Sequence, residues 1–205
     1  MLSLDHIAVA GETLDAAIAH VEDVLGVSLQ AGGEHDYFAT HNKLLRLADG
    51  LYIEAIAINP AATPKQSPRW FDLDRFQGAA RLACWICRTE DLEAALAQSP
   101  VDAGQPVQLA RGDLRWRMAV PETGVLPFDN HFPALLQWQG AQPAARLTDR
   151  GCRLRRLVVS HPEASVLRKV LGDVLQLRTP TVVFEQGEGG LMAEIDTPQG
   201  RRSLR

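Results

Sequence analysis

The chain has 205 residues, of which 46% are apolar and 22% are charged, and its formal net charge is -4. These fractions are those of an ordinary folded protein, so they exclude a disordered chain and a small disulfide-stapled scaffold. The weak negative charge excludes a field strong enough to gather nucleic acid.

The first predicted elements are a strand and an amphipathic helix. The strand covers residues 4–9, and Thr13 is placed to cap the helix that follows it. Apolar side chains recur along this helix at helical spacing, and a glycine ends it: Leu14, Ile18, Val21, Leu25 and Gly26.

Extended segments complete the first unit. The pair Gly32-Gly33 indicates a turn, residues 37–47 are extended, and Asp49-Gly50 marks a hairpin before a strand at 51–58. Residues 1–60 therefore form a predicted βαβββ module.

A linker rich in proline follows over residues 60–78. It contains Trp70 and Phe71, two large aromatic side chains that gain stability when they are buried. We expect them to pack the linker onto a sheet, with a cover over the mouth of a pocket as the alternative.

The first module recurs 78 positions later without a gap, and this places Leu82-Ala83-Cys84-Trp85-Ile86-Cys87 on Leu4-Asp5-His6-Ile7-Ala8-Val9. Thr89 is the predicted cap of a second helix, and strands are predicted near 107–110, 114–120 and 134–138. Residues 79–145 then form a second βαβββ module, paired with the first in one domain over 1–145. Chance likeness between two amphipathic helices is the alternative.

A third, partial βαβββ module is predicted over residues 150–205. It has strands at 154–159, 181–185 and 190–196, and Pro162 suits the first turn of its helix. The expected buried stripe of that helix is Val166, Leu167, Val170, Leu171 and Val174. The predicted fold class is α+β, with tandem βαβββ modules whose curved, mixed, largely antiparallel sheets surround a cup.

Strand alternation places two reactive side chains inside this cup. Leu4, His6 and Ala8 are expected on the concave face of the first strand, and Glu54 shares one face of its strand with Tyr52. A buried carboxylate needs a cation, a proton or a hydrogen-bond donor. Imidazole beside carboxylate predicts half of a divalent-metal site, whereas a hydrogen-bonded core histidine is the alternative.

The sequence resembles the vicinal-oxygen-chelate superfamily, specifically its glyoxalase-like domain branch. The resemblance rests on Leu-Asp-His-Ile-Ala-Val at the start, on Leu51-Tyr52-Ile53-Glu54, and on the tandem βαβββ organisation, with further likeness in residues 41–47 and 69–73. It covers most of residues 1–140. In that superfamily paired modules form a U-shaped sheet, and inward His, Glu or Gln residues hold a metal that chelates vicinal substrate oxygens.

The resemblance implies four ligand positions. His6 and Glu54 match directly, and through the repeat they correspond to Cys84 and Gln137. His6, Glu54 and Gln137 are the implied ligands for Fe, Mn, Zn, Ni or Co, with Glu54 as ligand or catalytic base. A thiol in place of the second histidine favours softer ions or removes the site, so a cup without metal is the alternative.

Four further residues are predicted to bind substrate: Asn42, Arg46, Tyr52 and Cys84. Arg46 shares a strand face with Asn42, and it is expected to bind either an anionic substrate group or Glu54 in a salt bridge. Cys84 as a small buried hydrophobe is the competing interpretation.

Two classes of function follow. The first is an enzyme-like protein that binds a small oxygenated molecule, with metal-dependent isomerase, lyase or dioxygenase chemistry. The second is a metal-free protein of the bleomycin-resistance type that sequesters a small molecule, and a vestigial pocket whose sheet supports a homodimer is a third possibility. Without a run of roughly 20 apolar residues or a secretion signal, and with an odd number of cysteines, we expect a cytoplasmic protein without membrane or nucleic-acid partners.

Overall fold

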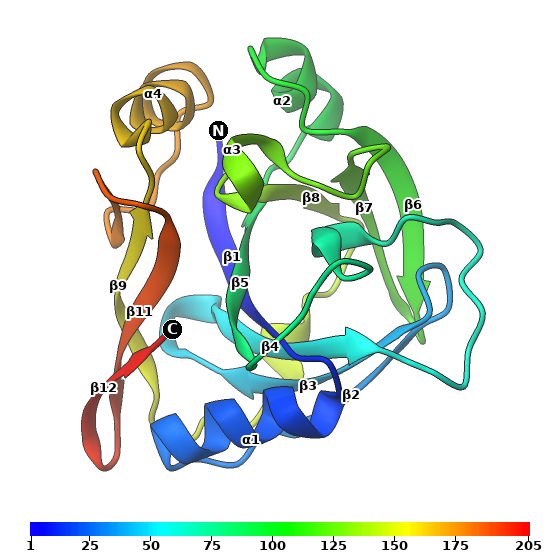
Figure 1. Cartoon of the computed structure of the whole chain (residues 1–205), viewed down its shortest axis with the longest axis vertical. Helices are drawn as coiled ribbons and strands as arrows, with labels where there is room; N and C mark the ends of the chain where they lie inside the picture. Colours follow the sequence, from blue (N-terminus) through cyan, green and yellow to red (C-terminus); the bar gives the residue numbers. More distant parts are fainter.

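A computed structural model describes residues 1–205, which form two sheets flanked by four α-helices (Figure 1). The larger sheet contains β1 (Ser3–Ala10), β2 (Gln30–His35), β3 (Thr40–Arg46), β4 (Tyr52–Ile58), β5 (Arg81–Arg88), β6 (Gln105–Arg111), β7 (Leu114–Val120) and β8 (Ala134–Trp138). The smaller contains β9 (Arg153–Ser160), β10 (Val182–Glu185), β11 (Gly190–Thr197) and β12 (Gly200–Leu204).

The helices are α1 (Leu14–Leu25), α2 (Leu92–Gln98), α3 (Pro127–Asn130) and α4 (Ala164–Lys169). Short helical turns occur at η1 (Ala48–Gly50), η2 (Trp70–Asp72) and η3 (Pro143–Arg146), and a π-helical turn, η4 (Val170–Val174), extends α4. None of these helices has the length and apolar character needed to cross a membrane.

The larger sheet has the strand order β2-β3-β4-β1-β5-β8-β7-β6. β1 pairs in parallel with β4, β5 pairs in parallel with β8, and β1 and β5 join the two halves antiparallel. The first module, β1 to β4 with α1, therefore has the same topology as the second, β5 to β8 with α2. This confirms the predicted α+β class with tandem βαβββ modules around a cup.

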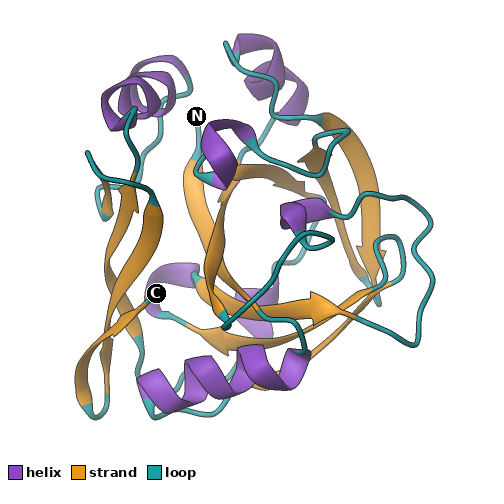
Figure 2. Cartoon of the chain, viewed as in Figure 1, coloured by secondary structure: helices purple, strands orange, loops and turns teal.

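The sheet curls further than a U, and its edge strands β2 and β6 come together (Figure 2). A Cβ atom built on Gly33 of β2 would lie 2.8 Å from Cδ of Arg111 at the end of β6. The two edges are not hydrogen-bonded neighbours. Side chains close the barrel at this seam.

Two hydrophobic cores lie on opposite faces of the larger sheet. The outer core joins α1, α2 and the smaller sheet to residues such as Ile7 and Trp85. The inner core fills the barrel and includes Phe38, Trp70 and Met118. Burying one such side chain contributes about 1.5–3 kcal/mol, so both cores favour the closed sheet.

Helix α1 begins and ends as predicted. The Thr13 side chain accepts a hydrogen bond from the Ala16 amide, and Gly26 adopts a left-handed φ of 66° at the end. In α2 the cap is Asp91 instead of Thr89, because the Asp91 side chain accepts from the Ala94 amide and Thr89 accepts from Asp91.

Leu4 lies in the outer core, opposite to its predicted side. The pairing of β1 with β5 shifts register between Leu4 and His6, with Asp5 at the irregularity. A bulge of this kind breaks strict alternation, so Leu4 leaves the concave face while His6 keeps it.

The third module departs from the arrangement of the first two. Its order is β10-β9-β11-β12, with β9 between its parallel and antiparallel partners, and β12 was not predicted. Val166 and Val174 are 45% and 36% exposed, in contrast to the predicted stripe. The change to π-helical hydrogen bonding at Val170 alters the helical period, which moves Val174 out of line.

Candidate functional site

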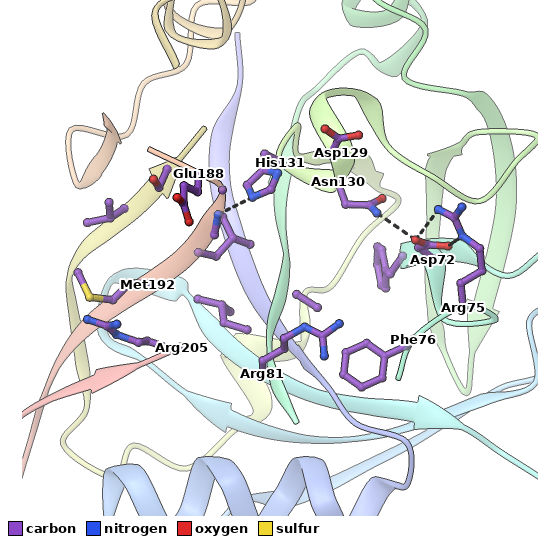
Figure 3. Close-up of a pocket in the computed structure, with 18 residues that line it drawn as sticks. Asp72, Arg75, Phe76, Arg81, Asp129, Asn130, His131, Glu188, Met192 and Arg205 are labelled. Carbon is purple, nitrogen blue, oxygen red and sulfur yellow. Dashed lines mark hydrogen bonds and ion pairs between the residues drawn. The ribbon is translucent and has the colours of Figure 1, made fainter. Parts of the chain in front are cut away.

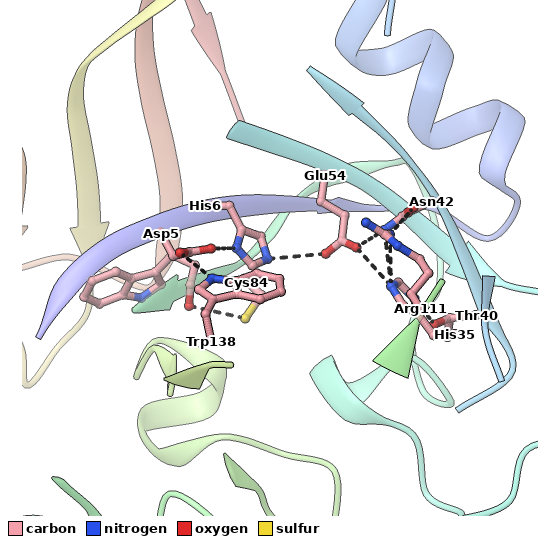
Figure 4. Close-up of polar contacts among 10 residues, drawn as sticks. Asp5, His6, His35, Thr40, Asn42, Glu54, Cys84, Arg111 and Trp138 are labelled. Atoms are coloured by element: carbon pink, nitrogen blue, oxygen red, sulfur yellow. Dashed lines mark hydrogen bonds and ion pairs between the residues drawn. The ribbon is translucent and has the colours of Figure 1, made fainter. Parts of the chain in front are cut away.

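A buried chain of polar side chains crosses the inside of the barrel (Figure 4). His6 and Glu54 project from the neighbouring parallel strands β1 and β4, and each is 5% exposed. Nε2 of His6 lies 3.6 Å from Oε2 of Glu54. The two groups predicted to meet inside the cup therefore do so.

Asp5 fixes the other side of the His6 ring. Its Oδ1 lies 2.7 Å from Nδ1 of His6, and its Oδ2 accepts hydrogen bonds from Trp138 Nε1 at 2.9 Å and Arg88 Nη1 at 3.3 Å. The bulge at Asp5 turns this side chain toward its sequence neighbour. Asp5 thus orients the imidazole so that Nε2 faces Glu54.

The charges of these groups support one another. Burial alone would lower the pKa of His6, but hydrogen bonds and charge from Asp5 and Glu54 outweigh it, and that pKa is raised. Burial would raise the pKa of Glu54, but His6 lowers it to about 2. Both shifts favour the charged forms, with the His6 ring between two carboxylates, and Tyr52 stacks on this ring at 4.3 Å between centroids.

The glycine pair at 32–33 lies within β2 and sets the orientation of Asn42. The β2–β3 register shifts between Ala31 and Gly33, and the Gly33 amide donates to Oδ1 of Asn42 at 2.9 Å. A Cβ on Gly32 would lie 2.0 Å from that oxygen, so only glycine fits. With Oδ1 occupied, Nδ2 of Asn42 donates to Oε1 of Glu54.

His35 and Arg111 extend the chain and were not predicted. Arg111 reaches across the seam from β6, and its Nη1 donates to Oδ1 of Asn42 at 2.9 Å and lies 3.3 Å from Nε2 of His35. This nitrogen faces donors, so it accepts, and the proton on Nδ1 is directed to Thr40 Oγ1 at 3.0 Å. Burial, with the Arg111 and His6 charges, lowers the pKa of His35 to about 4, so the ring is neutral.

These polar groups surround a cavity of about 30 Å³. This volume holds on the order of one or two water molecules, and no larger ligand. Trp70 and Phe71 of the linker fill the remaining space, with Trp70 stacked on Phe38 at 4.7 Å between centroids. Nε1 of Trp70 is buried beside this cavity without a hydrogen-bond partner.

Asn42 and Tyr52, two of the residues predicted to bind substrate, line the cavity. Arg46 does not line this cavity, and its Nη1 donates to the carbonyl of Leu147 at 3.2 Å. The anticipated Arg46 to Glu54 salt bridge is absent, because Asn42 and His6 occupy both carboxylate oxygens of Glu54.

Gln137 does not join His6 and Glu54. Its Nε2 donates to the Glu90 carbonyl at 2.6 Å, and its Oε1 accepts from the Leu92 amide at 3.3 Å, beside the start of α2. The β5–β8 register puts Ala134, three residues earlier, in the position of Glu54. An odd displacement along a strand reverses the face, so Gln137 points outward.

Cys84 lies on the inner face, as its alignment with His6 predicts, but within the apolar core. Its Sγ lies 3.6 Å from the Trp85 carbonyl. Burial raises the pKa of its thiol to about 12, with the Glu54 charge adding to the effect. A thiol of this kind stays protonated and is a poor metal ligand.

The residues present do not fit a divalent-metal centre. No group of three or more His, Cys, Asp or Glu side chains is placed to hold an ion. Nε2 of His35, which lies 4.0 Å from Oε1 of Glu54, faces the Arg111 guanidinium, whose positive charge opposes a cation there.

Asp5, His35 and Arg111 left little trace in the sequence pattern. Asp5 is drawn inward by a bulge, and β2 is an edge strand whose exposed positions lack the apolar alternation that marks a strand. The one available signal was the glycine pair, because glycine inside a strand often marks a bulge or a close backbone approach.

A comparison with family models agrees with this geometry. The model of the glyoxalase-like domain matches residues 4–175. The chain belongs to this family. The resemblance to the vicinal-oxygen-chelate superfamily is thereby confirmed, whereas a comparison with curated proteins finds no match.

Several solved structures are similar to this family member at low sequence identity. A hypothetical protein from Staphylococcus aureus is 17% identical with a TM-score of 0.67, covering 98% of this chain and 92% of that one. The 2,2',3-trihydroxybiphenyl 1,2-dioxygenase of Sphingomonas wittichii strain RW1 is 16% identical with a TM-score of 0.50, covering 96% and 74%. Methylmalonyl-CoA epimerase from Mycobacterium tuberculosis is 21% identical with a TM-score of 0.43, covering 70% and 91%.

Proposed function

We propose that the chain binds a small oxygenated molecule inside the barrel and exchanges a proton with it through His6 and Glu54. The observation that carries this proposal is the His6–Glu54 pair, buried at a polar cavity in an otherwise apolar interior, with both pKa values shifted toward the charged forms. Ionised pairs in such surroundings are costly to bury and are often kept for chemistry. The unpartnered Nε1 of Trp70 adds a donor suited to a ligand oxygen.

The pair supports acid–base chemistry in two linked steps. His6 donates its Nε2 proton to a carbonyl oxygen of the ligand, which stabilises an enol. Once the imidazolium charge is lost, the pKa of Glu54 rises and its carboxylate takes the proton from the adjacent carbon. When the adjacent carbon carries a hydroxyl group, the intermediate is an enediol. Glu54 then returns its proton to the former carbonyl carbon, and the hydroxyl proton of the second oxygen passes to His6, so that the new carbonyl forms and the isomerisation is complete.

A ligand larger than water needs room that Trp70 and Phe71 now occupy. Both belong to the linker between the modules, and η2 carries them into the barrel. Binding therefore requires the two side chains to move outward. In this proposal the two residues combine both roles considered for them, the predicted packing onto a sheet and the alternative cover over the pocket.

The uptake of deuterium by hydroxyacetone, which has oxygens on adjacent carbons, tests the acid–base step. In heavy water we expect the wild-type protein to speed exchange at its methylene carbon, and Glu54→Gln to lose at least about 100-fold of that rate. Gln137→Ala is the matched control and keeps the wild-type rate. A wild-type rate equal to that of buffer would refute the proton transfer.

A second function, sequestration without chemistry, is favoured by Cys84 and Ala134 at the positions equivalent to His6 and Glu54. It predicts thermal stabilisation by an oxygenated ligand that survives a chelator and persists in Glu54→Gln. Loss of stabilisation in Glu54→Gln together with loss of exchange favours the first proposal.

The metal-dependent form of the activity is tested by elemental analysis of protein purified without added metal. Because the inner residues do not assemble a ligand set, we expect the same negligible metal content in the wild type and in His6→Ala. Stoichiometric Fe, Mn, Zn, Ni or Co in the wild type that is absent from His6→Ala would instead support a metal-dependent activity.

A further inference from the structure

We infer that a second site, in the cleft between the two sheets, binds a small planar organic anion. The cleft has a volume of about 800 Å³, against about 30 Å³ inside the barrel. Small-molecule sites are commonly roughly 300–1,000 Å³. The inference does not rest on the function proposed for the barrel, although Phe71 lines both the cleft and the barrel cavity.

The cleft combines an apolar floor with charged rims (Figure 3). Segments from β5, β9 and β11 form it together with the η2 and α3 turns. Its apolar surface comes from Phe71, Leu82, Ala83, Val158, Leu191 and Met192. A flat hydrocarbon ring gains burial on such a floor, while its polar substituents reach the rims.

Arg81 and Phe76 form the recognition surface for an anion. The guanidinium carbon of Arg81 lies 4.1 Å from the centre of the Phe76 ring. Its Nη1 donates to the carbonyls of Gln77 at 2.9 Å and Ala79 at 3.2 Å, and no carboxylate pairs with it. A guanidinium held over an aromatic ring keeps its charge available to a planar anion, which its fork of N–H donors can bind.

In the same cleft the charge of Arg75 is neutralised by a carboxylate, in contrast to that of Arg81. Its Nε and Nη2 donate to both oxygens of Asp72, at 2.7 and 2.8 Å. Arg205 lies on the side of Arg81 in Figure 3, with Asp129 and Glu188 across the cleft. These carboxylates repel an anion from their own rim, so they favour a ligand whose other end carries a hydroxyl or amino group.

The walls of the cleft are held in place before a ligand arrives. Left-handed backbone angles are disfavoured outside glycine, yet they occur along both turns that line it: Phe71, Asp72, Phe128, Asp129 and Asn130. Such residues persist where tertiary contacts fix them, and they gather at functional sites. Here Asn130 Nδ2 donates to Asp72 at 3.2 Å, and the Gly190 amide donates to Nε2 of His131 at 2.7 Å, which ties α3 to β11.

Titration with 4-hydroxybenzoate tests the site, and the methionines report where it binds. The chain has three, of which Met192 lines the cleft and Met118 lines the barrel cavity. In protein labelled with ¹³C at the methionine methyl groups, we expect saturable shifts of Met192 and none of Met118. Arg81→Gln should raise the dissociation constant at least about tenfold, because one charge-assisted hydrogen bond is lost.

Two controls keep the result specific. Arg117→Gln removes the same charge from an arginine paired with Glu93 outside the cleft, and it should leave the affinity unchanged. Glu54→Gln should also bind normally, so failure of the barrel proposal does not mimic failure here. Lack of saturable binding, a shift of Met118 instead of Met192, or equal weakening by Arg81→Gln and Arg117→Gln would each overturn the cleft site.

Discussion

The two modules of the larger sheet share one topology but differ in the side chains they place inside the barrel. The pairing registers align four polar residues of the first module, His6, His35, Asn42 and Glu54, with Cys84, Leu109, Met118 and Ala134 of the second. A polar cluster in one half thus faces an apolar one in the other. The two modules therefore share a backbone arrangement, but only the first places polar groups at these four positions inside the barrel.

The second module still serves the polar cluster, through donors. Arg88 and Trp138 donate to Asp5, and Arg111 donates to Asn42. The first module supplies the carboxylates and both imidazoles. Buried carboxylates are tolerated when donors surround them, so the donors of the second module stabilise the carboxylates of the first.

Removing Asp5 should have the largest effect. Asp5→Ala leaves His6 and Arg88 without their buried partner, and we expect the free energy of unfolding to fall by about 3–5 kcal/mol. Urea denaturation measures it. Cys84→Ala, in the apolar half, removes one sulfur and should cost about 1 kcal/mol. Equal losses in the two variants would contradict the division of chemistry between the modules.

The response to acid should also arise in the first module. The pKa of His35 is lowered to about 4, so the unfolded chain binds more protons below pH 6.5, and folding should lose up to about 3 kcal/mol as the pH falls from 6.5 toward 4. His35→Gln should flatten this part of the stability curve. A curve of unchanged slope in His35→Gln would show that another group is responsible.

His6 and Glu54 determine how the stability of the fold changes at the two ends of this pH range. Glu54, with its pKa lowered to about 2, stabilises the fold above pH 4.5 and loses this effect as the pH falls toward 2. His6, with a raised pKa, stabilises below pH 6.5 and loses this effect as the pH rises through its folded value. Glu54→Gln should therefore lower the pKa of His6, measured by NMR titration.

Arg111 tests the donor role of the second module at a smaller scale. Arg111→Gln removes the charge that reaches Asn42 and His35, and we expect a loss of about 1.5 kcal/mol with a rise in the pKa of His35. Arg115→Gln, at a nearby exposed arginine that bonds to backbone carbonyls, should change stability by less than about 0.5 kcal/mol. An unchanged His35 titration in Arg111→Gln would remove the proposed support across the seam.

The smallest effect is expected at Gln137. Gln137→Ala breaks hydrogen bonds to Glu90 and Leu92 on the outer face and should cost about 0.5–1.5 kcal/mol. Because its side chain points away from the barrel, the pKa of His6 should not move. A shift in that pKa would show that Gln137 interacts with the His6–Glu54 pair.

The fold could be predicted from the sequence because the spacing of apolar residues indicates which side chains are buried. The alternation in residues 51–58 put Glu54 inside, and the helical spacing with Thr13 and Gly26 gave the bounds of α1. These signals depend on local chemistry and repeat in each module. Residues of the later strands were harder to align, since the offset between the modules differs from strand to strand, and Gln137 was assigned to the wrong face of β8.

Most of the site depends on features without a pattern of their own. The bulge at Asp5, the close approach of Gly32 to Asn42 and the reach of Arg111 from β6 are tertiary events. Each needs the curvature of the complete sheet. The same curvature brings Trp70 and Phe71 inside, so the sequence predicted an open pocket where the structure has a filled barrel.

The meeting of β2 and β6 through side chains gives the barrel one weak line. Every other neighbouring pair in the ring shares main-chain hydrogen bonds, and this one does not. Separating the two strands therefore costs side-chain contacts alone, chiefly those of Arg111. Solvent deuterium should reach His35 and Asn42 from this side first, and a tether linking the two edges should slow their amide exchange without touching the rest of the sheet.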